Sequence, residues 1–158
     1  FINSGVTTHF AAMALKARKS LNIVTNSQAV AMELGAHIGF RVILLGGEIN
    51  VQYLFTYGSD ALEQALHYKA DKAILSIDGV TFREGLTTYH AEEAVIDRMM
   101  MERARSTIVA ADLTKLGHES FSQVCRLEQI HTLVTNKGAD PALLAEIRAA
   151  GPDVILAE

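Results

Sequence analysis

The first residues of the chain combine glycine with hydroxyl side chains, and residues 3–8 read NSGVTT. If a strand ends here and a helix begins, the first N–H groups of that helix are unpaired at the positive end of its macrodipole. The hydroxyl groups of Ser4, Thr7 and Thr8 would add further donors around the turn at Gly5. This combination predicts a cradle for a phosphate or carboxylate group, although the same residue types are common in ordinary turns before helices.

Further side chains suit the opposite wall of such a pocket. Asp78, which precedes Gly79, suits a hydroxyl-rich ligand or the role of general base, and turn chemistry is its alternative interpretation. The ammonium group of Lys115 would bind a phosphate group as a point charge, and an ordinary surface lysine is the alternative interpretation. Glu93 follows a second loop of small and hydroxyl residues that contains Thr87, although an acid in the first turn of a helix also matches the macrodipole.

Several kinds of site lack their sequence signatures. Neither GxGxxG nor the Walker pattern occurs, so no nucleotide cofactor is expected. The six histidines are dispersed without ligand spacing, which predicts no metal site. The GxSxG motif is absent, and no pattern demands catalysis. The single cysteine, Cys125, lies beside Val124 and close to Leu127, which favours a half-buried structural thiol over a nucleophile.

The composition is that of a folded chain. Its 158 residues suffice for one domain with a single core, and hydrophobic residues make up 49% of them and charged residues 20%. The net charge of −4 argues against a nucleic-acid-binding surface, which needs clustered Lys and Arg. No apolar run is long enough for a membrane span. A lone cysteine fits the reducing cytosol, so a cytoplasmic location is expected.

These side chains must be positioned by strands and helices, and the sequence alternates between apolar runs typical of strands and patterns typical of helices. Strands are predicted at residues 22–25, 41–45, 73–77, 107–111, 131–135 and 153–157. Helices are predicted at residues 8–17, 28–34, from 58 onward, at 91–105, and between Asp140, a cap followed by Pro141, and Gly151. Residues 80–85 are expected to form an irregular loop or a small hairpin. The alternation predicts an α/β fold with a mainly parallel sheet and helices on both faces.

Ligands of such sheets bind beyond the carboxyl ends of the strands. The polar and small residues that directly follow predicted strands are therefore candidates for the binding site. Besides the residues already named, they include Asn26, Ser27, Gly46 and Gly47.

A series of short motifs runs through nearly the whole chain in a fixed order. It comprises NSGVTT (3–8), VTNS (24–27), LLGGE (44–48), YGSDA (57–61), ADKAIL (70–75), DG (78–79), GLTT (85–88), EEA (92–94), MERAR (101–105) and ADLTKLG (111–117). The series closely resembles the C-terminal sensor domain of DeoR-family transcriptional regulators. Each motif is weak alone, but ten in order are specific.

The resemblance implies a fold shared with glucosamine-6-phosphate deaminase, ribose-5-phosphate isomerase and the CoA transferases. It also implies a preceding winged helix-turn-helix domain that binds operator DNA and that this chain, which begins in mid-strand, does not contain. Effectors in this family are typically phosphorylated sugars or related metabolites. By the same resemblance, Ser4, Gly5, Thr7 and Thr8 match the phosphate loop, Asp78 the sugar-facing acid and Lys115 the distal basic ligand.

The chain departs from the family pattern in several places. Where the first loop usually reads DSGTTT, Asn3 replaces the acid and Val6 one threonine, so the cradle is expected to lose a charge and a hydroxyl donor. Asp97 stands where a basic residue is common, which puts a phosphate contact from that turn in doubt. The related deaminases carry a catalytic histidine shortly after the DG pair, whereas residues 80–83 here read VTFR.

The leading hypothesis is a 158-residue effector-sensing domain of a bacterial regulator of sugar metabolism, acting as a repressor in a homo-oligomer. A phosphosugar would bind across residues 4–8 and Lys115 and alter DNA binding by the full-length protein. The alternative is a sugar-phosphate isomerase or deaminase with Asp78 as general base and Glu93 as its partner. A third hypothesis is an oligomerising scaffold whose pocket no longer functions.

Overall fold

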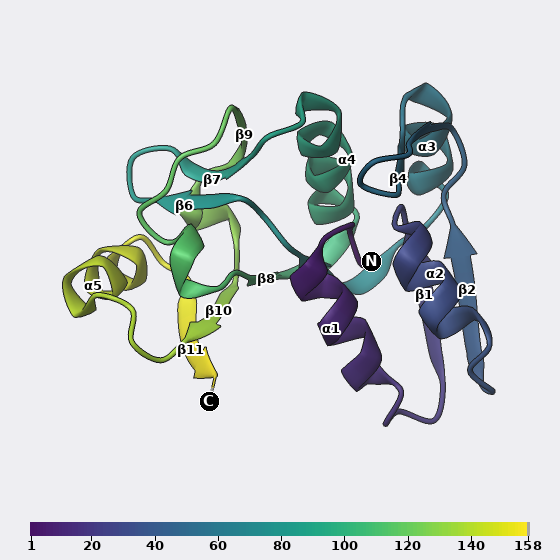
Figure 1. Ribbon diagram of the computed structural model, residues 1–158, viewed down its shortest axis with the longest axis horizontal. Helices are drawn as coiled ribbons and strands as arrows, with labels where there is room; N and C mark the ends of the chain where they lie inside the picture. Colours follow the sequence, from purple (N-terminus) through teal and green to yellow (C-terminus); the bar gives the residue numbers. More distant parts are fainter. Residues whose placement is uncertain (158) are drawn as a thin grey trace.

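A parallel sheet runs through the centre of the computed structural model, which describes residues 1–157. Its strands are β1 (Leu21–Thr25), β2 (Phe40–Leu44), β5 (Ala70–Leu75), β8 (Ala104–Ala110), β10 (Thr132–Asn136) and β11 (Asp153–Ala157). The paired orders are β1-β2 and β11-β10-β8-β5, and every pair is parallel. Residues 1–3 lie between the two groups (Figure 1), because the Ile2 N–H donates to Val24 and the Asn3 N–H to Ile74.

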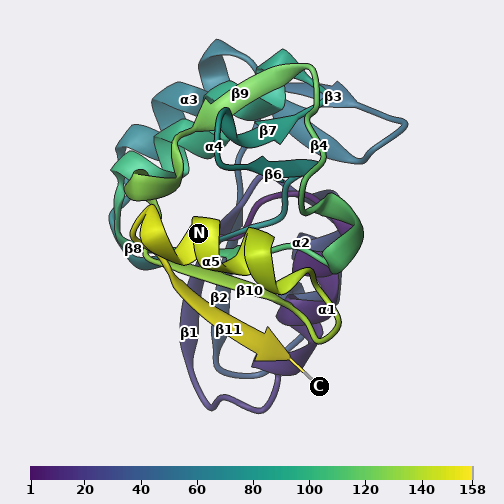
Figure 2. The same cartoon turned by 90° about the vertical axis from the view of Figure 1, so that its left-hand side faces the viewer.

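Helices cover both faces of this sheet, as the alternating pattern predicted. Helices α1 (Val6–Leu15) and α2 (Gln28–Gly35) pack against Ile2 and Ile23 on one face. Helices α3 (Ser59–Leu66), α4 (Ala91–Glu102) and α5 (Pro141–Ala149) lie on the other. Figure 2 shows α3 and α4 at the top of the molecule and α1 at the lower right. The predicted fold class, α/β with a mainly parallel sheet, is confirmed.

Two small antiparallel units are added to this framework. Strands β6 (Gly79–Thr81), β7 (Gly85–Thr88) and β9 (Ser122–Cys125) pair in the order β6-β7-β9, and β3 (Glu48–Asn50) pairs with β4 (Phe55–Tyr57). Short 3-10 turns occupy Leu113–Lys115 and Leu127–Gln129. The hairpin expected at residues 80–85 is present, with its strands reaching one residue earlier and three residues later.

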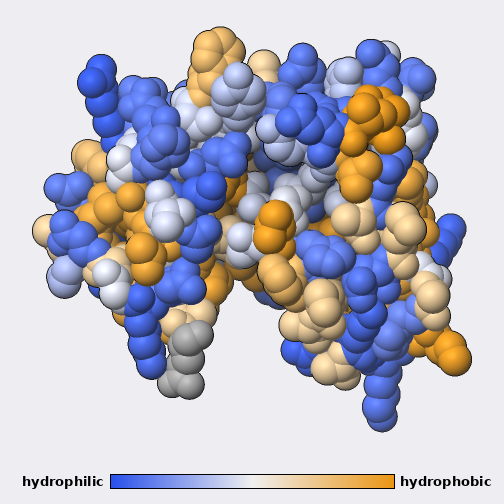
Figure 3. All heavy atoms as spheres, in the orientation of Figure 1, coloured by the Kyte–Doolittle hydropathy of each residue, from blue (hydrophilic) through white to orange (hydrophobic). Residues whose placement is uncertain are grey.

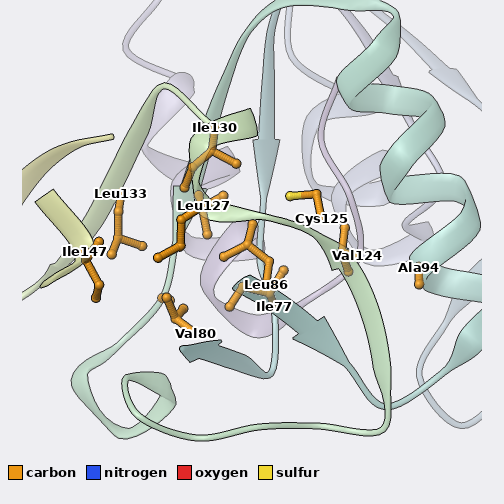
Figure 4. Close-up of a cluster of buried hydrophobic side chains, with 12 residues drawn as sticks. Ile77, Val80, Leu86, Ala94, Val124, Cys125, Leu127, Ile130, Leu133 and Ile147 are labelled. Carbon is orange, nitrogen blue, oxygen red and sulfur yellow. The ribbon is translucent and has the colours of Figure 1, made fainter. Parts of the chain in front are cut away.

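A buried cluster joins the β6-β7-β9 unit to the main sheet and to α5. Figure 4 shows Leu86, Val124, Leu133 and Ile147 from these different elements gathered in one place. Cys125 belongs to the same cluster and is 6% exposed, and its burial raises the pKa of the thiol to about 12. The thiol is therefore structural, as expected, but it is more deeply buried than the sequence indicated. Because the cluster fixes the hairpin, it also fixes the Asp78 turn that leads into it.

The helix ends show where local signals were sufficient and where they were not. At α5 the Asp140 side chain accepts a hydrogen bond from the Ala142 N–H at 2.9 Å, and the predicted cap is confirmed. The prediction of a helix over residues 91–105 was wrong at its end, because α4 stops at Glu102 and Arg105 already lies in β8. Arg103 is the C-cap residue of α4, and the chain turns there into β8, which pairs with β5.

Candidate functional site

The N-terminus of α1 is an uncapped helix end at the centre of the molecule. Its N-cap residue is Gly5, with φ 152° and ψ 156°, a conformation that is essentially restricted to glycine. A Cβ atom on Gly5 would lie 2.7 Å from the Cβ of Ser76. No side chain caps the first turn, since the Thr8 hydroxyl turns back to the carbonyls of Asn3 and Gly5 at 3.0 Å. The first N–H groups of α1 thus receive no side-chain acceptor, as anion binding requires.

A pocket of about 860 Å³ opens at this helix end. It brings together seven of the residues that the sequence singled out, although they are spread over more than a hundred residues of sequence: Ser4, Gly5, Thr7, Ser27, Asp78, Glu93 and Lys115. Figure 3 shows hydrophilic side chains around the hollow in this face of the molecule. The carboxyl ends of several strands meet here, which is the position expected for a ligand of a parallel sheet.

The other six predicted residues do not line this pocket. Thr8 and Asn26 are fully buried, and the Asn26 amide donates to the Thr56 carbonyl at 3.2 Å. Gly46 donates its N–H to Gln64 of α3 at 2.9 Å, and Gly47 packs beside it. Gly79 and Thr87 lie in the β6-β7 hairpin, where the Thr87 hydroxyl accepts the N–H of Ser120 at 2.9 Å.

One end of the pocket is acidic. The Oδ2 atom of Asp78 accepts hydrogen bonds from the Tyr89 N–H at 2.9 Å and from the Thr88 hydroxyl at 3.1 Å. The same hydroxyl lies 2.9 Å from Oε2 of Glu93. Burial, with a further contribution from the nearby Asp78 charge, raises the pKa of Glu93 to about 7. Asp97, one helical turn further along α4, is fully buried, and burial and the Glu93 charge raise its pKa well above the usual range.

Two of the residues that depart from the family pattern, Asn3 and Asp97, contact each other. The Asn3 amide donates to Oδ1 of Asp97 at 2.9 Å and to the Ser76 carbonyl at 2.9 Å, and its oxygen accepts the Ser76 N–H at 2.8 Å. Neither side chain has any exposed surface. The expectation that Asn3 alters the charge of the cradle is corrected here. Its amide uses both N–H groups inside the fold, joining the first residues of the chain to Ser76, which directly follows β5, and to α4.

Basic side chains also line the pocket. Lys115 ends a 3-10 turn whose cap, Asp112, accepts the Thr114 N–H at 2.8 Å. His9 of α1 and His118 of the following loop line the same pocket. Among the residues described here, no carboxylate lies within ion-pair distance of Lys115. Its ammonium group is therefore not held in an ion pair and can bind an anion in the pocket. Its acidic neighbour Asp112 also lines the pocket, and the hydrogen bonds from Thr114, together with the Lys115 charge, lower the pKa of that carboxyl group.

Several lining residues were not anticipated from the sequence. Tyr53 approaches the pocket from the β3-β4 loop, where its carbonyl accepts the Ser4 hydroxyl at 3.3 Å and its ring lies 4.9 Å from that of His90. No periodic pattern marks this loop. Thr88, by contrast, could have been found, because it is the second threonine of the GLTT motif that pointed to Thr87.

Two further properties of the chain concern possible metal sites and membrane-spanning helices. Within residues 1–157, no group of three or more His, Cys, Asp or Glu side chains is arranged to hold a metal ion. The helices of this part of the chain are too short or too polar to cross a membrane.

Comparison with known proteins identifies the family. A model described as the DeoR C terminal sensor domain matches residues 1–137. The chain is 32% identical to the HTH-type transcriptional repressor GlcR of Bacillus subtilis, over 86% of this chain and 52% of that protein. It is 28% identical to a putative aga operon transcriptional repressor of Escherichia coli O157:H7, over 98% and 58% of the two chains.

A third relative is the glycerol-3-phosphate regulon repressor of Escherichia coli K12, which is 28% identical over 86% of this chain and 54% of that protein. The chain thus spans about half the length of the curated relatives that it matches. The matched family is a sensor domain, and the relatives are named as transcriptional repressors and regulators. The chain therefore belongs to the DeoR C-terminal sensor domain family, and it is a regulatory domain, not an enzyme.

Proposed function

We propose that this domain binds a phosphorylated sugar or a related phosphorylated metabolite. The observation that carries the proposal is the position of Lys115 in the same pocket as the uncapped N-terminus of α1. Helix N–H groups, the Thr7 hydroxyl and an ammonium group are together the donors that bind phosphate esters in proteins. The Ser4 hydroxyl joins them when it exchanges its hydrogen bond to the Tyr53 carbonyl for one to the phosphate. The carboxyl groups of Asp78 and Glu93, which line the same pocket, suit the hydroxyl groups of a sugar.

The size of the pocket agrees with this class of ligand. Its volume of about 860 Å³ falls within the range of roughly 300–1,000 Å³ typical of small-molecule sites. The aromatic side chains of Phe10, Tyr53 and Tyr89 also line it. These rings provide apolar surface for the carbon skeleton of a sugar, while the polar side chains bind its phosphate and its hydroxyl groups.

The biological role follows from the family. In the proposed full-length protein, an N-terminal winged helix-turn-helix domain binds operator DNA in the cytoplasm, and the sensor domains associate as a homo-oligomer. An effector that binds the DNA-competent and the released arrangements with different affinity shifts the balance between them. The relative named for a glycerol-3-phosphate regulon is consistent with a phosphorylated effector.

A thermal-shift panel tests the ligand class. Glucose 6-phosphate, ribose 5-phosphate and glycerol 3-phosphate are compared with glucose, ribose and glycerol. A ligand at a hundred times its Kd adds about 2.7 kcal/mol of stability, which corresponds to a rise in Tm of roughly 5–10 °C for a domain of this size. We expect such a rise for at least one phosphate ester. The proposal is wrong if only unphosphorylated compounds stabilise the domain.

Variants locate the binding site. Lys115→Ala removes the ammonium group and is expected to weaken binding of the stabilising phosphate ester about tenfold or more, the usual cost of a charge-assisted hydrogen bond. Lys19→Ala is the matched control, because Lys19 is exposed and does not line the pocket. Equal affinities for the two variants would contradict the assigned role of Lys115.

A further inference from the structure

The Thr88 hydroxyl lies between two carboxyl groups that both line the pocket. Its oxygen is 3.1 Å from Oδ2 of Asp78 and 2.9 Å from Oε2 of Glu93. A hydroxyl group has one proton to donate. Both short contacts can be separate, full-strength hydrogen bonds only if one of the two carboxyl groups is protonated and donates to Thr88, because two carboxylates would have to share the single hydroxyl proton.

The hydrogen bond from Tyr89 decides which carboxyl group that is. The Oδ2 atom of Asp78 already accepts the Tyr89 N–H at 2.9 Å, so this oxygen acts as an acceptor. The arrangement that satisfies every contact is then an ordered chain. The Glu93 carboxylic acid donates to the Thr88 oxygen, and the Thr88 hydroxyl donates to the Asp78 carboxylate.

We infer that Thr88 joins Glu93 and Asp78 into a unit holding one proton, so that this end of the pocket carries one negative charge and is suited to neutral hydroxyl groups instead of an ammonium group. This inference rests on the proposed function for the identity of the pocket. It deepens that function by naming the chemistry that the acidic end selects.

The surroundings of Glu93 favour the protonated acid. Its helix neighbour Asp97 has no exposed surface, and no hydrogen-bond partner is found for its Oδ2 within the described chain. A second ionised carboxylate beside this buried acid would be poorly solvated. Burial raises the pKa of Glu93 in the direction that this arrangement requires.

The charged and titratable groups around this end of the pocket come from every element packed against it. Arg98 of α4 points away, since its guanidinium group donates to the Gln123 carbonyl at 2.7 Å. The buried Cys125 thiol of β9 stays neutral. The remaining groups line the pocket itself: His9, Tyr53, Tyr89, His90, Asp112, Lys115 and His118.

The unit has a consequence for ligand choice. A hydroxyl group donates to Asp78 without changing the proton on Glu93, so its binding should depend little on this proton below about pH 7. An ammonium group is held better by two carboxylates than by one, so it would expel the proton. Its relative affinity should therefore rise as the pH increases toward 7.

The proton itself can be observed without any ligand. We expect carbon-13 NMR of the domain, with its glutamate side-chain carboxyl groups labelled, to show one carboxyl group that titrates near pH 7. That resonance should be absent in Glu93→Gln and present in Glu92→Gln, which alters an exposed neighbour on the same helix. In Thr88→Val the midpoint should change, because the connecting hydroxyl is lost. A Glu93 resonance that titrates in the ordinary glutamate range would overturn the inference, whatever the effector is.

Ligand selection is measured with two matched probes, glucose 6-phosphate and glucosamine 6-phosphate. Between pH 5.5 and 7.5, the affinity for the amine relative to the hydroxyl compound should rise several-fold in the unmodified domain and stay constant in Glu93→Gln. Stronger binding of the amine at every pH would overturn the assignment. If neither probe binds, the proposed effector class fails, while the NMR titration still decides the protonation of Glu93.

Discussion

Replacement of Glu93 by glutamine should change how the stability of the domain depends on pH. The pKa of this carboxyl group rises from 4.5 to about 7 on folding, because burial disfavours the charged form. The neutral acid therefore stabilises the folded domain. This contribution to the unfolding free energy is fully present below pH 4.5 and is lost as the pH rises through 7. A rise in pKa of this size corresponds to a contribution of about 3 kcal/mol to the unfolding free energy. Glutamine has no proton to lose, and its amide can still donate to Thr88.

Urea denaturation of the two proteins between pH 5 and pH 8 measures this difference. The unfolding free energy of Glu93→Gln, taken relative to the unmodified domain, should increase by roughly 2–3 kcal/mol over this range. Other titrating groups are present in both proteins and largely cancel in the difference. Asp97 is the exception, because the Glu93 charge raises its pKa, and the loss of that charge in Glu93→Gln adds to the difference in the same direction. Glu92→Gln serves as the control and should show a difference that is nearly independent of pH. Parallel stability curves for Glu93→Gln and the unmodified domain would refute a buried acid at this position.

Three further predictions concern the scaffold of the pocket. Gly5→Ala should lower the unfolding free energy by about 1–3 kcal/mol or more, because its backbone conformation suits glycine alone and a Cβ would lie 2.7 Å from a neighbouring side chain. The control Gly35→Ala, a helical position with open space around it, should be neutral or stabilising in the same denaturation assay, and equal losses would contradict the strain argument. Asn3→Asp should destabilise the domain by several kcal/mol, because it sets two buried carboxyl groups against each other. Adding Asp97→Asn should restore part of that loss in a double-mutant cycle, and purely additive effects would show that the two side chains are not coupled. Cys125 should react with a thiol reagent only at the rate of unfolding, since its thiol is buried and its pKa is about 12; rapid labelling of the folded domain would disprove this.

The main sheet and its helices were predictable because their signals are local. Runs such as residues 107–111 and 153–157 are apolar enough to mark buried parallel strands, and Asp140 and Pro141 mark the start of α5. The short strands β3, β4 and β9 were not predicted. They comprise only three or four residues each, and β9 is defined by its pairing with β7, a partner distant in the sequence.

The site was predictable in outline only. A glycine and hydroxyl loop before a helix suggested the anion-binding end, and strand-end positions suggested Asp78 and Lys115. What the sequence did not reveal was which polar side chains face the pocket and which face the interior. Asn3 and Asp97 meet across 94 residues of sequence, and their contact depends on how residues 1–3 insert into the sheet. No periodicity or motif spacing contains that information.

In the proposed function, the first turn of α1 receives the phosphate group of the effector. This contact can be observed by titrating the nitrogen-15-labelled domain with the phosphate ester that stabilises it most. The amide resonances of Val6, Thr7 and Thr8 should shift strongly, and the matched unphosphorylated compound should leave them in place. Shifts confined to the shallow surface around residues 69–71 and 102–105, with the α1 amides unchanged, would contradict the account.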